Sequence, residues 1–348
     1  MPVFLNANYP GPERRSGLDW PRAQPGALDR PRSTFLHIGL VNNMGDAAMR
    51  ATEHQYLTLL DEAAGDMRVH FTLYTLPEVE RTPVGRRRVS SFYTSVEQLW
   101  EQPPGQWPDG LIVTGREPRA PDLRDEVYWP SFTRLLAWTQ EHARSAVWSC
   151  LAAHAAVLAL DGIERVRSPY KHFGILTCGP ATPHALLAGA PASLRFPHSR
   201  WNGISAGSLA ANGYQVLTRT SDGGVDTFVK QDAGLFVFFQ GHPEYDSETL
   251  LGEYRRDVRR YLVGETETYP LLPRDYFEEE TERSLREIEA RAQGSRQEKL
   301  LGEVSAVLNS ARIHNTWRST AVLIYRNWLR HLCTQKRHGG HLLCGARA

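Results

Sequence analysis

Five short apolar runs alternate with segments of helical periodicity, and this alternation constrains the fold more than any other feature. Each run is shorter than an ordinary helix and suits a buried strand. Strands separated by helices predict an α/β fold with a mostly parallel sheet and helices on both faces. Ligands then bind at the carboxyl ends of the strands. The runs are residues 35–41, 69–73, 110–114, 147–150 and 235–239, and helices are expected over 46–63, 130–143 and 248–262.

The rest of the chain is organised around this predicted sheet. Residues 166–230 contain frequent Gly and Pro and predict a β-rich excursion such as a hairpin. Charged residues at helical spacing over 278–301 and an amphipathic, aromatic segment over 317–332 predict a C-terminal helical extension. The expected division is an irregular segment at 1–33, a catalytic domain at 34–333 and a basic, mobile tail at 334–348.

Length and composition exclude several classes of protein. With 348 residues, 41% of them hydrophobic, the chain can build a large core. A net charge of +1 gives no attraction to nucleic acid, and no apolar run is long enough to cross a membrane. The first residues lack the basic and apolar regions of a secretory signal, and the four cysteines lack metal-ligand spacing. We therefore expect a cytoplasmic chain with reduced thiols, no metal and no bound cofactor.

Two of the apolar runs lead into residues that suit nucleophilic catalysis. His242 and Glu244 follow the last run and point the same way, so one can act as a base while the other fixes its tautomer. Cys150 ends another run and precedes a small-residue helix, whose exposed amides and dipole favour a thiolate. Together they predict a Cys-His-Glu triad for acyl transfer. Taken singly, a buried inert cysteine and a simple His-Pro turn remain alternatives.

A set of segments stands out at residues 109–115, 128–129, the turn at Cys150, 171–174, 197–201, 241–246, 253–257, 317–319 and 327–329. Over about residues 35–333, they resemble the homoserine O-acyltransferases of the homoserine transsuccinylase type. They also occur in the same order along the chain. The resemblance implies a class I glutamine amidotransferase-like fold turned to acyl transfer.

The resemblance assigns the catalytic roles. It implies that Cys150 accepts the acyl group, that His242 is its base and that Glu244 orients the imidazole. The oxyanion donors should be backbone amides, one at Leu151 and one in the loop after Gly115.

The same resemblance implies an amino-acid site. Lys171, Ser199 and Arg256 match positions near that substrate. The guanidinium of Arg256 offers two parallel donors to the homoserine carboxylate, and the hydroxyl of Ser199 can donate or accept. Without the resemblance, an exposed helix cation would be the simpler interpretation of Arg256.

Two segments depart from the family pattern. Where the family has a Pro-Lys-Lys stretch after the first strand, residues 43–53 form a longer turn with only Arg50 as a cation. L-serine therefore remains an alternative acceptor. Arg119 stands where acetyl-using members carry Glu and succinyl-using members carry Gly. Because a guanidinium attracts the free carboxylate of succinyl-CoA, we expect that donor in preference to acetyl-CoA.

The resemblance thus implies a homoserine O-succinyltransferase of methionine biosynthesis, which passes an acyl group from succinyl-CoA through a Cys150 thioester to the L-homoserine hydroxyl. Homoserine O-acetyltransferase, L-serine O-acyltransferase and, less readily, glutamine amidotransferase are the alternatives. The complete triad argues against a catalytically dead module. The expected partners are these small molecules, without nucleic acid or membrane, and a homodimer stays open. Residues 86–88 could contact CoA phosphates, although a solvated charge run is the favoured interpretation.

Overall fold

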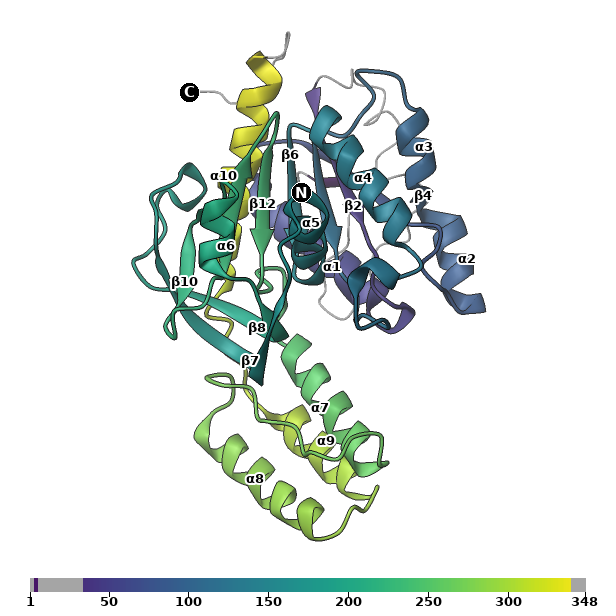
Figure 1. Ribbon diagram of the computed structural model, residues 1–348. Coiled ribbons are helices and arrows are strands. Elements are labelled where there is room, and N and C mark those ends of the chain that lie inside the picture. The colour runs from purple at the N-terminus through teal and green to yellow at the C-terminus, as the bar shows by residue number, and fades with distance from the viewer. Residues whose placement is uncertain (1–2, 6–33, 339–348) are drawn as a thin grey trace.

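The centre of the computed structural model, which describes residues 3–5 and 34–338, is a nine-stranded sheet (Figure 1). The strand order is β1-β3-β2-β5-β6-β12-β11-β9, and β4 pairs with β3. Pairing is parallel from β1 to β12, whereas β11 is antiparallel to both β12 and β9. The bounds are β1 Val3–Leu5, β2 Leu36–Val41, β3 Val69–Thr75, β4 Thr94–Ser95, β5 Gly110–Thr114, β6 Ser145–Ser149, β9 Gln215–Val216, β11 Thr227–Gln231 and β12 Leu235–Phe239.

Helices cover both faces of this sheet, because successive strand residues point to opposite sides. Ile112 and Val147 belong to the core beneath α1 (Asp46–Ala64) and α10 (Arg318–His338). Their neighbours Val113 and Trp148 belong to the core beneath helices on the other face. The helices that contribute to this second core are α3 Val96–Glu101, α4 Trp129–His142, α5 Leu151–Asp161 and α6 Ala206–Ala211, and α2 spans Pro83–Phe92. Within residues 3–5 and 34–338, no helix combines the length and the apolar character that a membrane crossing needs.

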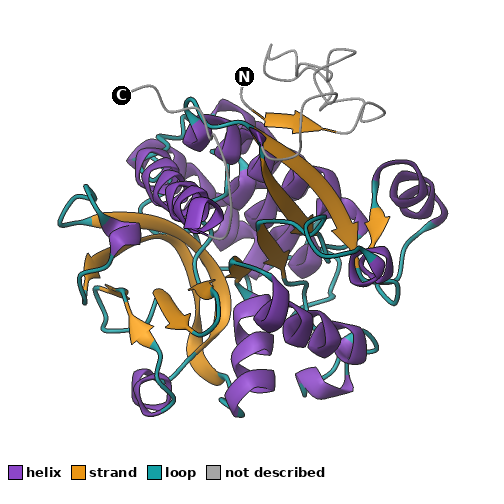
Figure 2. Ribbon diagram, turned by 90° about the horizontal axis from the view of Figure 1, so that it is seen from above, coloured by secondary structure: helices purple, strands orange, loops and turns teal. Residues whose placement is uncertain are grey.

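A second sheet of three strands stands beside the central one. Its order is β10-β7-β8, and all its pairs are antiparallel. The long strands β7 and β8 curve next to the central sheet, as the view from above shows (Figure 2). The bounds are β7 Val166–Pro180, β8 Leu194–Gly203 and β10 Thr218–Thr220.

Three helices form a separate layer below the β7–β8 hairpin (Figure 1). They are α7 Thr249–Leu262, α8 Glu279–Gly294 and α9 Leu300–Ser310. They share a core in which Tyr254, Leu285 and Val304 are fully buried, and Phe173 of β7 joins it. This contact fixes α7 against the hairpin.

The fold confirms the expected α/β architecture, the β-rich excursion and the C-terminal helical extension. Residues 278–301, expected as one solvated helix, are instead split between α8 and α9, and α8 buries one side. Residues 334–338 of the expected tail belong instead to α10, which continues to His338, and Lys336 donates to Asp109 Oδ2 at 2.6 Å. The strand β1 lies within the segment expected to be irregular. Residues 6–33 and 339–348 lie outside the described residues.

Candidate active site

Cys150 occupies the turn between β6 and α5. Its φ of 51° and ψ of −112° are rare for a residue with a side chain and cost of order 1–3 kcal/mol. Its backbone N–H donates to the carbonyl of Phe239 at 2.7 Å, which ties the turn to the end of β12. The residue is partly exposed and is not in a disulfide. A strained, accessible thiol between a strand and a helix has the geometry of a nucleophile elbow.

The first turn of α5 meets the loop that follows β5. A Cβ placed on Gly115 would lie 2.5 Å from Leu151 Cβ and 2.7 Å from Ala152 N, so only glycine allows this approach. The amides of a first helical turn have no partner within the helix and carry partial positive charge. The backbone beside Cys150 can therefore receive a developing oxyanion.

His242 and Glu244 lie at the same edge of the sheet as Cys150. This follows from the register, in which Ser149 of β6 pairs with Phe239 of the neighbouring parallel strand β12. His242 Nδ1 is 2.8 Å from Glu244 Oε1. A carboxylate in this position holds the proton on Nδ1, so Nε2 is the ring atom available to the thiol.

The charge state of His242 suits a thiolate neighbour. Burial alone lowers the pKa of the imidazole, but the Cys150 and Glu244 side chains, through charge and hydrogen bonding, raise its pKa well above the ordinary value. The imidazolium is therefore favoured while the thiolate is present. The pair can deliver a nucleophile and return a proton to a leaving group.

Lys171 and Arg256 converge on one carboxylate of α7. Lys171 Nζ donates to Asp257 Oδ2 at 2.9 Å, and Arg256 Nε donates to Asp257 Oδ1 at 2.9 Å. These contacts hold the pKa of Asp257 below its usual value against the opposing effect of burial. Two cations thus lie together on the wall between β7 and α7.

Ser199 reaches the same helix through a different acid. Its hydroxyl donates to Glu253, whose other oxygen accepts from the Tyr245 hydroxyl at 2.7 Å. The Tyr245 ring stacks on His242 with centroids 4.1 Å apart. Ser199 is therefore connected to the catalytic candidates by one acid and one aromatic ring.

A cavity of about 310 Å³ opens beside Lys171. Tyr170, His172, Leu271 and Arg274 are among the residues that line it. Its volume is at the lower end of the range for small-molecule sites, and three of these four side chains can donate a hydrogen bond or carry charge.

The description of the matching family model is homoserine O-succinyltransferase, and the match extends over residues 27–338. The chain belongs to this family. A homoserine O-succinyltransferase of Rhodopseudomonas palustris is 40% identical over 331 residues, which cover 93% of this chain and 98% of the relative. One from Bradyrhizobium japonicum is 43% identical over 298 residues, which cover 85% of this chain and 90% of the relative.

Solved structures give weaker similarities. A glutamine amidotransferase from Methylobacillus flagellatus has a TM-score of 0.49 at 14% identity. The match covers 86% of this chain and 95% of the amidotransferase chain. A glutamine amidotransferase from Thermotoga maritima has a TM-score of 0.47 at 10% identity. The match covers 85% of this chain and 98% of the amidotransferase chain. Similarity at this level supports no statement about activity.

Unlike the other predicted site residues of this homoserine O-succinyltransferase family member, Arg119 has a largely exposed side chain. Its guanidinium pairs with Glu80, and its side chain is 61% exposed. Its backbone N–H donates to Glu126. The loop is thus anchored through the Arg119 backbone, and the side chain would have to leave Glu80 to meet a donor carboxylate.

The basic run at 86–88 is only partly solvated. Arg88 Nε donates at 2.9 Å to Glu53, an acid that is fully buried in α1, and Arg86 donates to a backbone carbonyl at 2.7 Å. Arg88 therefore fixes α2 to α1, a role that the charge pattern of the run does not indicate. Arg50, the lone cation of the altered turn, is exposed on α1.

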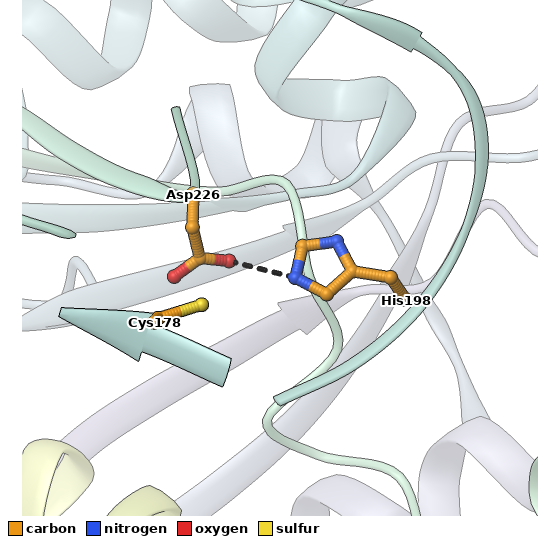
Figure 3. A group of neighbouring side chains, drawn as sticks. All are labelled: Cys178, His198 and Asp226. Carbon is orange, nitrogen blue, oxygen red and sulfur yellow. Dashed lines mark ion pairs between the residues drawn. The ribbon is translucent and has the colours of Figure 1, made fainter. Parts of the chain in front are cut away.

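Sequence reasoning missed a buried polar cluster directly behind His242. Figure 3 shows Cys178 of β7, His198 of β8 and Asp226, the residue that precedes β11. His198 and Asp226 are both fully buried, and His198 Nε2 lies 3.2 Å from Asp226 Oδ1. Residues 197–201 did stand out as a matching segment, but only Ser199 received a role. No local signal marks Asp226, since its partner is remote in the sequence.

Proposed function

We propose that this chain is a homoserine O-succinyltransferase that works through a thioester on Cys150. One observation carries the proposal: a strained cysteine, a buried His-Glu pair and a backbone oxyanion site share one sheet edge in a chain of this family. Family membership disfavours the glutamine amidotransferase alternative. A cytoplasmic location suits the proposal, because the reaction needs a reduced thiol.

The chemistry proceeds in two halves. The Cys150 thiolate attacks the thioester carbonyl of succinyl-CoA, and the oxyanion that forms is held by the Leu151 amide and a second amide after Gly115. The C–S bond to CoA breaks, and the His242 imidazolium protonates the leaving thiolate. In the second half, neutral His242 takes the proton of the acceptor hydroxyl as its oxygen attacks the enzyme thioester. Collapse of this second intermediate releases the ester and restores the thiolate and imidazolium.

We assign the acceptor to the wall between β7 and α7. Lys171 and Arg256 would bind the amino-acid carboxylate, and Ser199 would hydrogen-bond to its polar groups. Two cations that now share Asp257 support this assignment, because an incoming carboxylate can take over part of the same donors. L-homoserine is the expected acceptor and L-serine the alternative.

The family match supports a succinyl donor, and Arg119 is our candidate for the residue that selects it. If its guanidinium leaves Glu80, it can pair with the free carboxylate of a succinyl group, which acetyl-CoA lacks. We expect a preference for succinyl-CoA, and we expect Arg119→Glu to shift the donor ratio toward acetyl-CoA by about tenfold, or about 1.4 kcal/mol. An unchanged ratio in this variant would remove Arg119 from the donor site.

Intact mass measurement tests the thioester directly. Incubation with succinyl-CoA alone should add one succinyl group to the wild type and to Cys333→Ala, a variant in the buried cysteine of α10, but none to Cys150→Ala. The acylated protein is then mixed with L-homoserine or L-serine, and the ester product is identified. Acylation of Cys150→Ala to the wild-type extent would refute the mechanism, and transfer only to L-serine would replace the acceptor.

A further inference from the structure

The buried cluster of Cys178, His198 and Asp226 in Figure 3 packs beside Gly241, the residue that precedes His242. A Cβ placed on Gly241 would lie 2.8 Å from His198 Nε2 and 2.9 Å from Asp226 Oδ1. The backbone N–H of His242 donates to the carbonyl of Pro197 at 2.8 Å, and that of Gln240 donates to the carbonyl of Asp226 at 3.0 Å. The residues on both sides of Gly241 are therefore bound to the strands that bear the cluster.

The hydrogen bonds of the cluster determine where its proton lies. Arg200 Nε donates to His198 Nδ1 at 3.2 Å, so Nδ1 is an acceptor and the proton resides on Nε2. Nε2 lies 3.2 Å from Asp226 Oδ1, and neither of these two atoms makes a hydrogen bond to any described residue. Asp226 Oδ2 accepts from Thr218 and Thr227 hydroxyls at 2.7 and 2.8 Å.

The charges agree with this arrangement. Burial lowers the pKa of His198 to about 4, against the opposing effect of Asp226, so the ring is neutral at pH 7. Burial alone would raise the pKa of Asp226, but its contact with His198 and its hydrogen bonds from the Thr218 and Thr227 hydroxyls hold this pKa below the usual value. The cluster is therefore a neutral imidazole between a guanidinium and a carboxylate.

A metal ion suits the same atoms poorly. Cys178, His198 and Asp226 each place one ligand atom within 4.8 Å of the others. However, a metal on His198 Nε2 would need that nitrogen without its proton while Nδ1 still accepts from Arg200, which leaves no proton on the ring. Burial also raises the pKa of the Cys178 thiol, which opposes the thiolate that a metal needs.

We propose that the His198–Asp226 pair is a positioning relay for His242. Its two side chains fill the space beside Gly241, where a Cβ would not fit, and so fix the backbone from which His242 projects. Arg200 holds the His198 ring in the required tautomer and is itself anchored by a bond from its Nη1 to the carbonyl of Asn202 at 2.7 Å. The inference rests on the proposed role of His242 as the base.

The rate of Cys150 alkylation by iodoacetamide, measured against pH, tests the relay without any substrate. Asp226→Asn should move the midpoint of this profile upward by about one pH unit, because a displaced His242 stabilises the thiolate less. Asp161→Asn is the matched control, since Asp161 also accepts from a buried tyrosine and a lysine but lies at the far end of α5. The control should keep the wild-type midpoint. A folded Asp226→Asn with the wild-type midpoint would overturn the relay, even if succinyl transfer itself fails for another reason.

A second measurement needs no variant. In the wild type labelled with ¹⁵N-histidine, His198 should carry its proton on Nε2 at pH 7, and an equivalent of zinc should leave its ring shifts unchanged. A proton on Nδ1, or a zinc-dependent loss of the Nε2 proton, would contradict the proposal.

Discussion

At the scale of single residues, the site depends on one strained backbone position. Cys150 keeps a positive φ because its N–H donates to the carbonyl of Phe239 on the adjacent strand β12 and because α5 begins at the following residue. The strain is small beside the stability of a domain, but it aims the thiol at the edge where His242 emerges. Geometry and charge therefore meet in the same few atoms.

Substitutions within the triad should form a hierarchy. Cys150→Ala and His242→Ala should each reduce kcat by about 10⁴-fold or more, since each removes a group that makes or breaks a bond. The loss of kcat in Glu244→Ala should be about tenfold to a hundredfold smaller, because in the proposed mechanism Glu244 orients the ring and carries no proton to substrate. Steady-state kinetics on folded variants measures the order. Equal losses for Glu244→Ala and His242→Ala would mean that Glu244 has a chemical role.

The pKa of His242 should fall when the thiol is removed. The Cys150 side chain raises this pKa against burial, so in Cys150→Ala burial has less opposition. In the wild type, the raised pKa gives a contribution to the free energy of unfolding that is complete below pH 6.5 and is lost as the pH rises through the folded value. NMR titration of the His242 ring in both proteins decides the matter, and an equal pKa in the two would show that the residues do not interact.

At the scale of elements, helix α7 and the loop after β5 both reach the proposed triad, α7 through Tyr245 and the loop through Gly115. Acids of α7, Glu253 and Asp257, hold the side chains assigned to the acceptor. Gly115 brings the loop against the start of α5. Each of these two elements therefore allows a test that leaves the proposed triad unchanged.

Gly115→Ala should slow thioester formation by at least about tenfold. Its new Cβ would overlap Leu151 and push the first amides of α5 away from the oxyanion, a loss comparable to part of one donor. Gly45→Ala is the control, because nothing lies within 4 Å of a Cβ there. Single-turnover acylation by succinyl-CoA gives the rate. Wild-type acylation by Gly115→Ala would show that this loop supplies no oxyanion donor.

Arg256→Lys should lower kcat/KM for the amino acid by about 1–3 kcal/mol of transition-state stabilisation, since lysine keeps the charge but loses the two parallel donors. Thioester formation should be spared. The neighbouring exposed Arg255 supplies the control Arg255→Lys. If donor acylation falls as much as acceptor transfer, Arg256 is structural or belongs to the CoA site.

At the scale of the whole molecule, the core contains histidines that must stay neutral. His154 of α5 is buried, and burial lowers its pKa to about 3. The unfolded chain binds a proton near pH 6.5, whereas the folded chain does not. Stability is therefore complete above pH 6.5 and is lost as the pH falls toward the folded value.

His154→Leu should flatten the acid dependence of stability. Between pH 7 and pH 5 the wild type should lose about 2 kcal/mol from this residue, at about 1.4 kcal/mol per pH unit. The variant should lack that part of the decrease, whatever its stability at pH 7. Urea unfolding at the two pH values measures the difference. An unchanged difference would place the acid sensitivity in other groups.

The sequence alone determined five strands of the central sheet, β2, β3, β5, β6 and β12, and the helices α1, α4 and α7. Apolar runs too short for helices, separated by helical periodicity, admit few arrangements, and parallel strands bring their carboxyl ends to one edge. The positions of Cys150 and His242 after two such runs are therefore enough to predict that they meet. The helices at 46–64, 129–142 and 249–262 followed from the same periodicity, within a residue or two of their ends.

Only the tertiary structure decided what surrounds the triad. Asp226 lies 3.2 Å from His198 because folding brings the residue that precedes β11 against β8 of the other sheet, and no local pattern encodes such a contact. Arg88 binds Glu53, and Arg119 binds Glu80, because ion pairs form between charges that folding brings together from remote segments. Periodicity reports which side of an element is buried, whereas the partner of a buried charge depends on how whole elements pack.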